Sequence, residues 1–225
     1  MTSNFRLFGI THLAILSAVP LLAAALAFVQ RRLPPGSKWL RMTLGVLLLA
    51  DSVLWYTYLA IVDQPLFPSQ LPLELCDATL LLSIIELLTL SPLLFDLVYY
   101  WALAGTSMAL LTPDLWEQFP SLATVQFFVT HGLVIAAILY LAWSRQARPR
   151  PGSIWKAMLA VNLYAACVGA FDAIFKTNYM YLRAKPQNLS LLTWLGPWPW
   201  YIGSGEVVAC ILFLLLYLPF RRPSD

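Results

Sequence analysis

Charged residues are scarce in this chain, and their scarcity excludes a soluble globular protein. Of the 225 residues, 11% are charged and 60% are apolar, and the mean hydropathy is +0.73. Soluble domains carry about 25% charged residues. The net charge is only +3 and the basic residues are spread among loops, so nucleic-acid binding is not expected. The chain is therefore predicted to be an integral membrane protein.

Cysteine and histidine are also few. Cys76, Cys167 and Cys210 lie far apart in apolar segments and form neither a CxxC zinc pattern nor a disulfide framework. The two histidines, His12 and His131, show no His-x3-His or similar spacing, so we predict no metal site. The sequence has no internal repeat, and no loop is long enough to bury a core of its own.

Long apolar runs dominate what is present. A helix needs about 20 mainly apolar residues to cross a bilayer. Seven runs approach or exceed that length, separated by breaks that contain proline: 7–29, 39–60, 73–90, 93–111, 121–143, 153–175 and 199–219. Only Ser91-Pro92 separates the third run from the fourth, which leaves a tight hairpin as the alternative there. The predicted fold class is all-α, a polytopic bundle of about seven transmembrane helices in a single domain over residues 1–225.

Lys and Arg residues predict the orientation, because they accumulate on the cytoplasmic side of membrane proteins. A topology with the N-terminus outside and the C-terminus in the cytoplasm places ten basic residues inside and four outside. We expect a bacterial-type inner (plasma) membrane. The first run exceeds the roughly 7–15 apolar residues of a signal peptide, although Ala25-Leu26-Ala27 leaves a cleaved signal as an alternative.

The segment LELCDATLLLSIIE, residues 73–86, carries several reactive side chains in an apolar setting. Ionisable groups at membrane depth are costly and indicate function by default. Cys76 is the strong nucleophile among them. A reactive thiolate needs a cation, a helix N-terminus or a base nearby. The helix N-terminus is available by position, whereas Glu74 and Asp77 disfavour the thiolate. A structural, buried cysteine is the alternative.

His131 lies near the middle of the fifth run, in VTHGLVI. A cysteine nucleophile with a histidine base is a standard arrangement for covalent catalysis. Cys76 is expected ~8 Å to the outer side of the midpoint of its run, whereas His131 lies near the midpoint of its own run. Helix tilt or closure on a substrate must remove this offset before the two side chains can hydrogen-bond. A helix-to-helix hydrogen bond is the alternative role of His131. His12, near the outer end of the first run, is a second base, an orienting group or an interfacial residue.

Other polar features have several interpretations. Besides Glu74 and Asp77, five of the runs each carry one further acid, which suggests a wet interior and suits a proton-coupled transporter: Asp51, Glu86, Asp96, Asp172 and Glu206. Aromatic residues between Lys176 and Trp198 fit an interfacial belt. The same stretch alternatively forms a lid or a lipid-headgroup site, with phosphate bound by Lys176, Arg183 and Lys185. Residues 112–117 begin with a Thr cap and a Pro, which predicts a short interfacial helix.

Several motifs in order resemble a known family. LPLELCD (71–77), THG (130–132), NYMYLRAKP (178–186) and LGPWPWY (195–201), with His12 in the first run, resemble the YwaF-like integral membrane proteins. These are bacterial relatives of transmembrane protein 164. The resemblance implies a Cys-dependent acyltransferase that moves fatty acyl chains between phospholipids. A similar helical bundle is implied for androgen-induced membrane hydrolases, which use Thr and His.

Carried over to this chain, the resemblance implies Cys76 as the nucleophile and His131 as the general base. It leaves His12, Glu74, Asp77, Asn178 and Tyr179 as candidate supporting residues. The expected function is lipid acyl transfer or hydrolysis, in an intramembrane site open to the outer leaflet, with membrane phospholipids as substrates and no diffusible cofactor. A proton-coupled transporter or small-solute-binding protein is the main alternative, and a structural or assembly protein is the third. The sequence identifies no particular protein partner.

Overall fold

The computed structural model describes residues 5–62, 66–115, 117–186 and 190–221, and all regular structure in these ranges is helical. The α-helices are α1 (Ile10–Arg32), α2 (Trp39–Val62), α3 (Leu75–Thr89), α4 (Pro92–Tyr100), α5 (Ser107–Leu111), α6 (Leu122–Trp143), α7 (Ser153–Phe175), α8 (Leu191–Trp194) and α9 (Trp200–Tyr217). A π-helix, η1 (Trp101–Thr106), and two 3-10 turns, η2 (Tyr179–Tyr181) and η3 (Leu218–Phe220), complete the set. The all-α prediction is confirmed for the described residues.

Six helical stretches in the described ranges are long and apolar enough to cross a membrane. They are α1, α2, the continuous stretch Pro92–Leu111, α6, α7 and α9 extended to Phe220. The predicted third span at 73–90 is present as α3 but has only 15 residues. At 1.5 Å per residue α3 is about 22 Å long, short of the roughly 30 Å hydrocarbon core. It starts late because Glu74 adopts extended backbone, and it ends where Leu90 adopts a left-handed conformation.

Leu90 and Ser91 join α3 to α4 in a tight turn, so the hairpin alternative is the one observed. The Leu90 N–H donates to the Glu86 carbonyl at 2.8 Å, and Pro92 occupies the start of α4. Proline suits a first helical turn because it has no N–H to leave unpaired. In contrast, the helix expected from residue 112 does not form: residues 112–115 are non-helical. The Thr112 hydroxyl instead donates to the Met108 carbonyl at 3.2 Å and closes α5. Trp116 lies outside the described residues.

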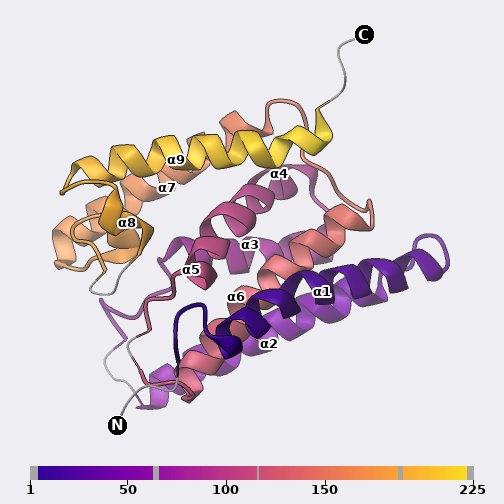
Figure 1. The fold of residues 1–225 in the computed structure, drawn as a ribbon, viewed down its shortest axis with the longest axis horizontal. Helices are drawn as coiled ribbons and strands as arrows, with labels where there is room; N and C mark the ends of the chain where they lie inside the picture. The colour runs from indigo at the N-terminus through magenta and orange to yellow at the C-terminus, as the bar shows by residue number, and fades with distance from the viewer. Residues whose placement is uncertain (1–4, 63–65, 116, 187–189, 222–225) are drawn as a thin grey trace.

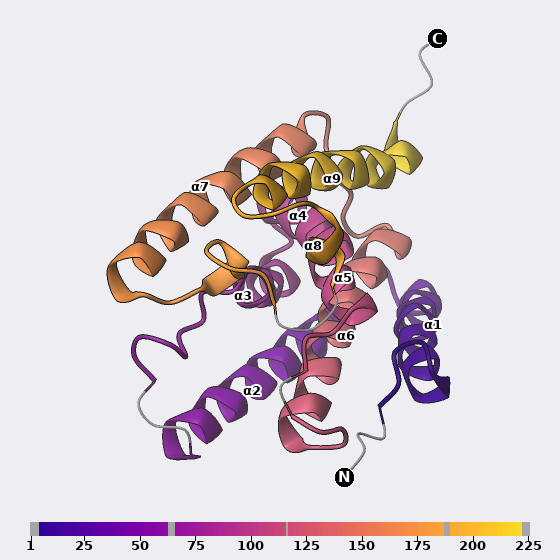
Figure 2. The same cartoon turned by 60° about the vertical axis from the view of Figure 1, so that its left-hand side comes forward.

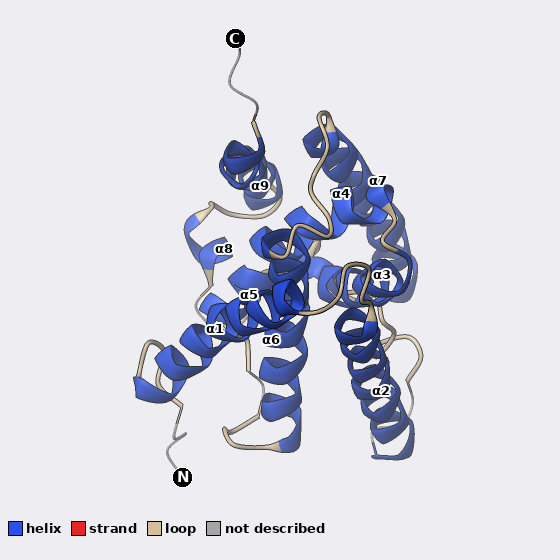
Figure 3. Ribbon diagram, turned by 90° about the vertical axis from the view of Figure 1, so that its right-hand side faces the viewer, coloured by secondary structure: helices blue, strands red, loops and turns tan. Residues whose placement is uncertain are grey.

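The helices form three layers (Figures 1 and 2). α7 and α9 make one outer layer, α1, α2 and α6 make the other, and α3, α4, η1 and α5 lie between them. Seen from the side in Figure 3, α2 and α6 descend away from the α7–α9 layer. The middle layer is buried on both sides, with Leu87, Phe95 and Tyr100 fully inaccessible. Loops 33–38 and 144–152 lie at the opposite end of the molecule from residues 112–115, 117–121 and 176–186 (Figure 1).

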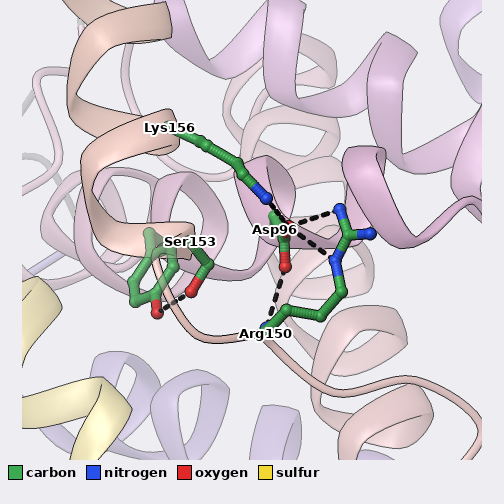
Figure 4. A network of polar contacts seen from close by, with 5 residues as sticks. Asp96, Arg150, Ser153 and Lys156 are labelled. Carbon is green, nitrogen blue, oxygen red and sulfur yellow. Dashed lines mark hydrogen bonds and ion pairs between the residues drawn. The ribbon is translucent and has the colours of Figure 1, made fainter.

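Asp96 ties the middle layer to α7 at the end that carries loop 144–152 (Figure 4). Its carboxylate is fully buried. It accepts the backbone N–H of Arg150 at 2.9 Å, two guanidinium N–H groups of Arg150 at 2.9 and 2.6 Å, and the Lys156 ammonium at 3.2 Å. The Tyr100 hydroxyl hydrogen-bonds Ser153 at 2.7 Å beside this network. A buried carboxylate needs such compensation, so Asp96 has a structural explanation here.

Candidate active site

A cavity of about 820 Å³ lies between the layers. Its walls come from α2, α3, η1, α6, α7, α9 and the turn at 179–182. Most of the wall is apolar, including Leu80, Val134 and Phe213, and polar side chains enter it from several elements, among them the first turn of α3. The volume is within the range of ordinary ligand pockets, about 300–1,000 Å³. The cavity is therefore large enough for a ligand, and each predicted site residue either lines it or lies outside its wall.

Cys76 occupies the second position of α3 and lines the cavity. Glu74 and Asp77, which lie on either side of Cys76 in the sequence, form a helix cap, because the Asp77 carboxylate accepts the Glu74 N–H at 3.1 Å. N–H groups in the first turn of a helix have no partner within the helix. They give this end of α3 a partial positive charge that favours an anion. The thiol is half-buried and lies beside that end, as the sequence predicted by position.

His131 lines the same cavity from α6. Its Nδ1 lies 2.7 Å from the Phe127 carbonyl oxygen. A carbonyl only accepts hydrogen bonds, so Nδ1 must carry the proton and Nε2 of the neutral ring bears the lone pair. The Phe127 ring, 4.0 Å away between centroids, packs against the imidazole. The local helix therefore fixes the tautomer that a general base requires.

Cys76 and His131 face one cavity but do not hydrogen-bond each other in the described part of the chain. Catalytic hydrogen bonds are often long or absent before substrate binds. The thiol and the imidazole therefore line the same cavity. Proton transfer between them requires that substrate binding bring them closer or that a water molecule bridge them.

The carboxylates near Cys76 are held by specific donors. The Tyr56 hydroxyl donates to Asp77 at 3.1 Å, and the Met180 N–H donates to Glu74 at 2.8 Å. Both acids line the cavity. Since Asp77 also caps α3, the two acids fix the entry into the helix and anchor the 176–186 segment. Through these contacts Glu74 and Asp77 position the segment that carries Cys76.

The 176–186 segment closes one end of the cavity through Tyr179, Met180, Tyr181 and Leu182. The Tyr179 hydroxyl donates to the Pro68 carbonyl and accepts the Leu71 N–H, both at 2.8 Å. Tyr179 lines the cavity, whereas Asn178 does not. The Asn178 side chain instead binds backbone groups of the segment itself, at Arg183 and Ala184.

Tyr181 links this segment to the chain after α5. Its hydroxyl donates to the Asp114 carboxylate at 2.8 Å, and its carbonyl accepts the Tyr201 hydroxyl. Burial and the neighbouring Asp114 carboxylate raise the pKa of Tyr181 well above its usual range. The phenol therefore remains a hydrogen-bond donor at any physiological pH, and the contact with Asp114 is permanent on that account.

The three cations assigned to a lipid headgroup lie on the same segment but outside the cavity wall. Lys176 donates to the Ala173 carbonyl at 3.1 Å, and Arg183 donates to the Asp172 and Thr177 carbonyls at 3.2 and 3.3 Å. Lys185 donates to the Thr193 carbonyl at 3.3 Å and lies over the Tyr201 ring. These contacts hold the side chains along the segment, and headgroup binding remains a prediction.

His12 is placed away from the cavity wall, fully buried between α1 and α5. Its Nδ1 accepts the Phe8 N–H at 2.9 Å, so Nε2 carries the proton and donates to the Leu110 carbonyl at 2.8 Å. Both ring nitrogens are thus occupied by backbone partners. The position matches neither an interfacial side chain nor a residue that reaches Cys76.

The five acids expected in the wet interior do not form one cluster, and only Glu86, Asp96 and Asp172 are fully buried. Glu206 lines the cavity and accepts the Asn162 amide at 2.9 Å. Asp51 accepts the Thr130 hydroxyl at 2.5 Å, next to His131. Asp172 accepts the Thr177 hydroxyl at 2.6 Å and the Tyr179 N–H at 3.1 Å. Asp96 belongs to the network with Arg150, and Glu86 is buried outside the cavity wall. In the described ranges no three His, Cys, Asp or Glu side chains group as metal ligands.

Some cavity residues were not predicted as site residues, although Thr130 and Tyr181 lie within the quoted motifs THG and NYMYLRAKP. Tyr56, Thr106, Thr130 and Tyr181 all line the cavity near Cys76 or His131. Tyr and Thr are common in apolar helices and interfacial loops, so their presence indicates nothing by itself. Tyr56 falls one turn after Ser52 on the face of α2 that meets α3, but that face is identified only once the helices are packed.

Comparison with known proteins identifies one family that this chain matches. The model of the TMEM164 family matches residues 7–217 of this chain. An uncharacterized protein of Treponema pallidum (strain Nichols) is 30% identical over 227 residues, an alignment that covers 100% of this chain and 93% of that protein. No solved structure matches the chain. The match spans every helix that contributes to the cavity.

Proposed function

The chain belongs to the TMEM164 family, and we propose that it transfers fatty acyl groups from membrane phospholipids, to a second lipid or to water, through Cys76. The observation that carries this proposal is that Cys76 and His131 line one cavity, with the lone pair of His131 on Nε2. The largely apolar wall suits an acyl chain, and polar side chains beside Cys76 and His131 suit the ester group. A YwaF-like bacterial identity within this family is part of the same proposal.

The proposed reaction has two halves. His131 Nε2 takes the proton of Cys76, and the thiolate attacks the ester carbonyl to form a tetrahedral oxyanion. Collapse breaks the ester bond, and the departing alkoxide of the lysolipid receives the proton from His131. A hydroxyl of the acceptor lipid, or water, then attacks the thioester while His131 again acts as base. The new ester or free acid leaves, and Cys76 recovers its proton.

The first turn of α3 supports the anionic steps. The positive end of its helix dipole lies beside Cys76, where it favours both the thiolate and the oxyanion. Glu74 and Asp77 oppose a thiolate by their charge, but both accept hydrogen bonds from fixed donors. The histidine base is therefore necessary in this mechanism, because the helix terminus acts against two nearby carboxylates.

The placement in the membrane is also proposed. An N-terminus outside and a C-terminus in the cytoplasm of an inner membrane would open the cavity toward the outer leaflet. The loops 33–38 and 144–152, which carry many of the basic residues, lie at the same end of the molecule. The 176–186 segment then lies at the outer surface, where Lys176, Arg183 and Lys185 would meet lipid phosphate.

Lipid turnover by the purified protein tests this function. The protein is reconstituted in vesicles of phosphatidylethanolamine and phosphatidylglycerol with a labelled acyl chain, and lipid products are separated over time. We expect Cys76→Ala and His131→Ala to abolish turnover. Cys210→Ala, which alters a cysteine outside the cavity wall, serves as the matched control and should keep full activity. Undiminished turnover by Cys76→Ala would overturn the proposed mechanism.

A second candidate function is proton-coupled solute transport. One observation favours it: Glu206 lies in the cavity wall, paired with Asn162, and acyl transfer has no use for this acid. A transporter would show saturable flux in vesicles that Glu206→Gln abolishes and Cys76→Ala leaves intact. The acyl-transfer mechanism predicts the reverse dependence on these two residues.

A further inference from the structure

Thr106 has a buried hydroxyl with no hydrogen-bond partner among the described residues. The residue is 2% exposed, and it lines the same cavity as Cys76. A buried hydroxyl without a partner is costly, and each instance calls for a specific explanation. Thr106 is also outside every role assigned above.

Helical threonines in this protein normally satisfy their hydroxyls locally. Thr79, Thr89 and Thr112 each donate to the carbonyl four residues earlier, at 2.7, 2.7 and 3.2 Å. Thr106 does not, because it ends the π-helix η1. The carbonyl four residues before it, on Ala102, instead accepts the Ser107 hydroxyl at 3.3 Å. π-Helical turns are frequent at functional sites, and here the turn leaves one hydroxyl free.

The free hydroxyl lies beside the reactive thiol. η1 packs on the first turn of α3, where a Cβ on Gly105 would lie only 3.4 Å from Leu75 Cδ2. The Thr106 hydroxyl lies within interaction range of the Cys76 thiol but makes no hydrogen bond to it. A donor in this place is next to the position where the carbonyl oxygen of a bound ester becomes an oxyanion.

We propose that Thr106 is a catalytic hydroxyl, which donates its hydrogen bond to the oxyanion formed when Cys76 attacks an acyl ester. The inference rests on the proposed function and adds a residue to it. The proton of Thr106 stays on Oγ1 throughout, and only the negative charge on the carbonyl oxygen grows and is lost. A preorganised donor of this kind accelerates acyl transfer because it meets charge that exists only in the transition state and the intermediate.

Two reactions of the same thiol test the proposal. p-Nitrophenyl butyrate acylates Cys76 through a tetrahedral oxyanion and releases p-nitrophenolate, whereas iodoacetamide alkylates it by direct displacement without an oxyanion. Both rates are measured in a Cys167→Ala, Cys210→Ala background. We expect Thr106→Val to slow acylation about 100-fold, the usual cost of one oxyanion donor, while alkylation stays within about 2-fold. Thr106→Ser, which keeps the hydroxyl, should acylate within several-fold of the parent.

Thr79→Val is the matched control, because Thr79 is fully buried on α3, lies outside the cavity wall and donates to its own helix. It should change neither rate by more than about 2-fold. Equal acylation by parent and Thr106→Val would overturn the inference and leave the proposed function standing. An equal loss of both reactions would also overturn it, since Thr106 would then act on the thiol. No acylation of Cys76 in the parent would overturn the proposed function itself.

Discussion

The two histidines show how one residue type serves two purposes in the same apolar setting. His12 uses both ring nitrogens for backbone partners, at Phe8 just before α1 and at Leu110 on α5, whereas only Nδ1 of His131 has a partner among the described residues, and His131 lines the cavity. The sequence predicted His131 as a base from its depth and its resemblance to a family. It left several roles open for His12, because hydrogen bonds between helices are set by packing that no local pattern encodes.

Replacing each histidine should separate stability from activity. His12→Ala removes two buried hydrogen bonds and leaves a buried carbonyl at Leu110 unpaired, so we expect a loss of about 2–4 kcal/mol in the free energy of unfolding. His131→Ala removes one bond to a carbonyl in its own helix, which should cost about 1 kcal/mol while abolishing acylation. Thermal unfolding in detergent micelles, with acylation of Cys76 measured alongside, checks both. A stable His12→Ala protein would contradict the structural role.

The helices themselves were largely predictable from the sequence. The bounds of the six long stretches differ from the predicted runs by at most three residues at either end. Apolar length and proline breaks suffice for these because both are local properties. The short length of α3 was missed, since leucines on both sides of the helix extend the apolar run beyond its ends. The π-helix η1 was also missed, because WALAGT contains nothing that distinguishes it from an α-helix.

The contact between α4 and α7 should depend on Asp96. Asp96→Asn replaces a carboxylate that accepts several charged or backbone donors, so we expect a loss of about 2–4 kcal/mol in stability. Lys156→Met should cost less than about 1 kcal/mol, because the Lys156 side chain is 44% exposed and its contact is long. Thermal unfolding of the two variants gives the comparison. A larger loss for Lys156→Met would refute this order of contributions.

The 176–186 segment should control access to Cys76. Tyr181→Phe removes the hydroxyl that donates a hydrogen bond to Asp114. In the native protein the raised pKa of Tyr181 keeps this hydroxyl protonated across physiological pH. We expect Cys76 to react several-fold faster with a bulky maleimide in this variant, as the hydrogen bond to a charged group is lost. The rate is followed by gel shift in a Cys167→Ala, Cys210→Ala background. An unchanged rate at all pH values from 6 to 9 would show that reagents enter elsewhere.

For the molecule as a whole, the layered packing creates the site. Cys76 comes from the middle layer and His131 from one outer layer, while α9 of the other outer layer closes the cavity. Sequence reasoning paired Cys76 with His131 by chemistry and by family resemblance. It did not find Tyr56 or Thr106, because their relation to Cys76 exists only after three layers have packed.

The orientation of the bundle in the membrane can be checked directly. In a cysteine-free background, Ser37→Cys probes the loop after α1, and Glu117→Cys probes the loop before α6. We expect an impermeant maleimide added to intact cells to label position 117 and not position 37, as the distribution of basic residues predicts. Permeabilised cells should label both. Labelling of position 37 alone in intact cells would reverse the topology and place the cavity toward the cytoplasmic leaflet.

Trapping the thioester tests acyl transfer through Cys76 most directly. The purified protein is incubated with phospholipid vesicles that carry a labelled acyl chain, then examined by intact mass and by peptide mapping, with His131→Ala alongside. Acyl transfer predicts one acyl adduct on Cys76 that hydroxylamine removes and that fails to form without His131. The absence of any adduct on Cys76, in a protein whose Cys76 still reacts with a small alkylating reagent, would contradict it.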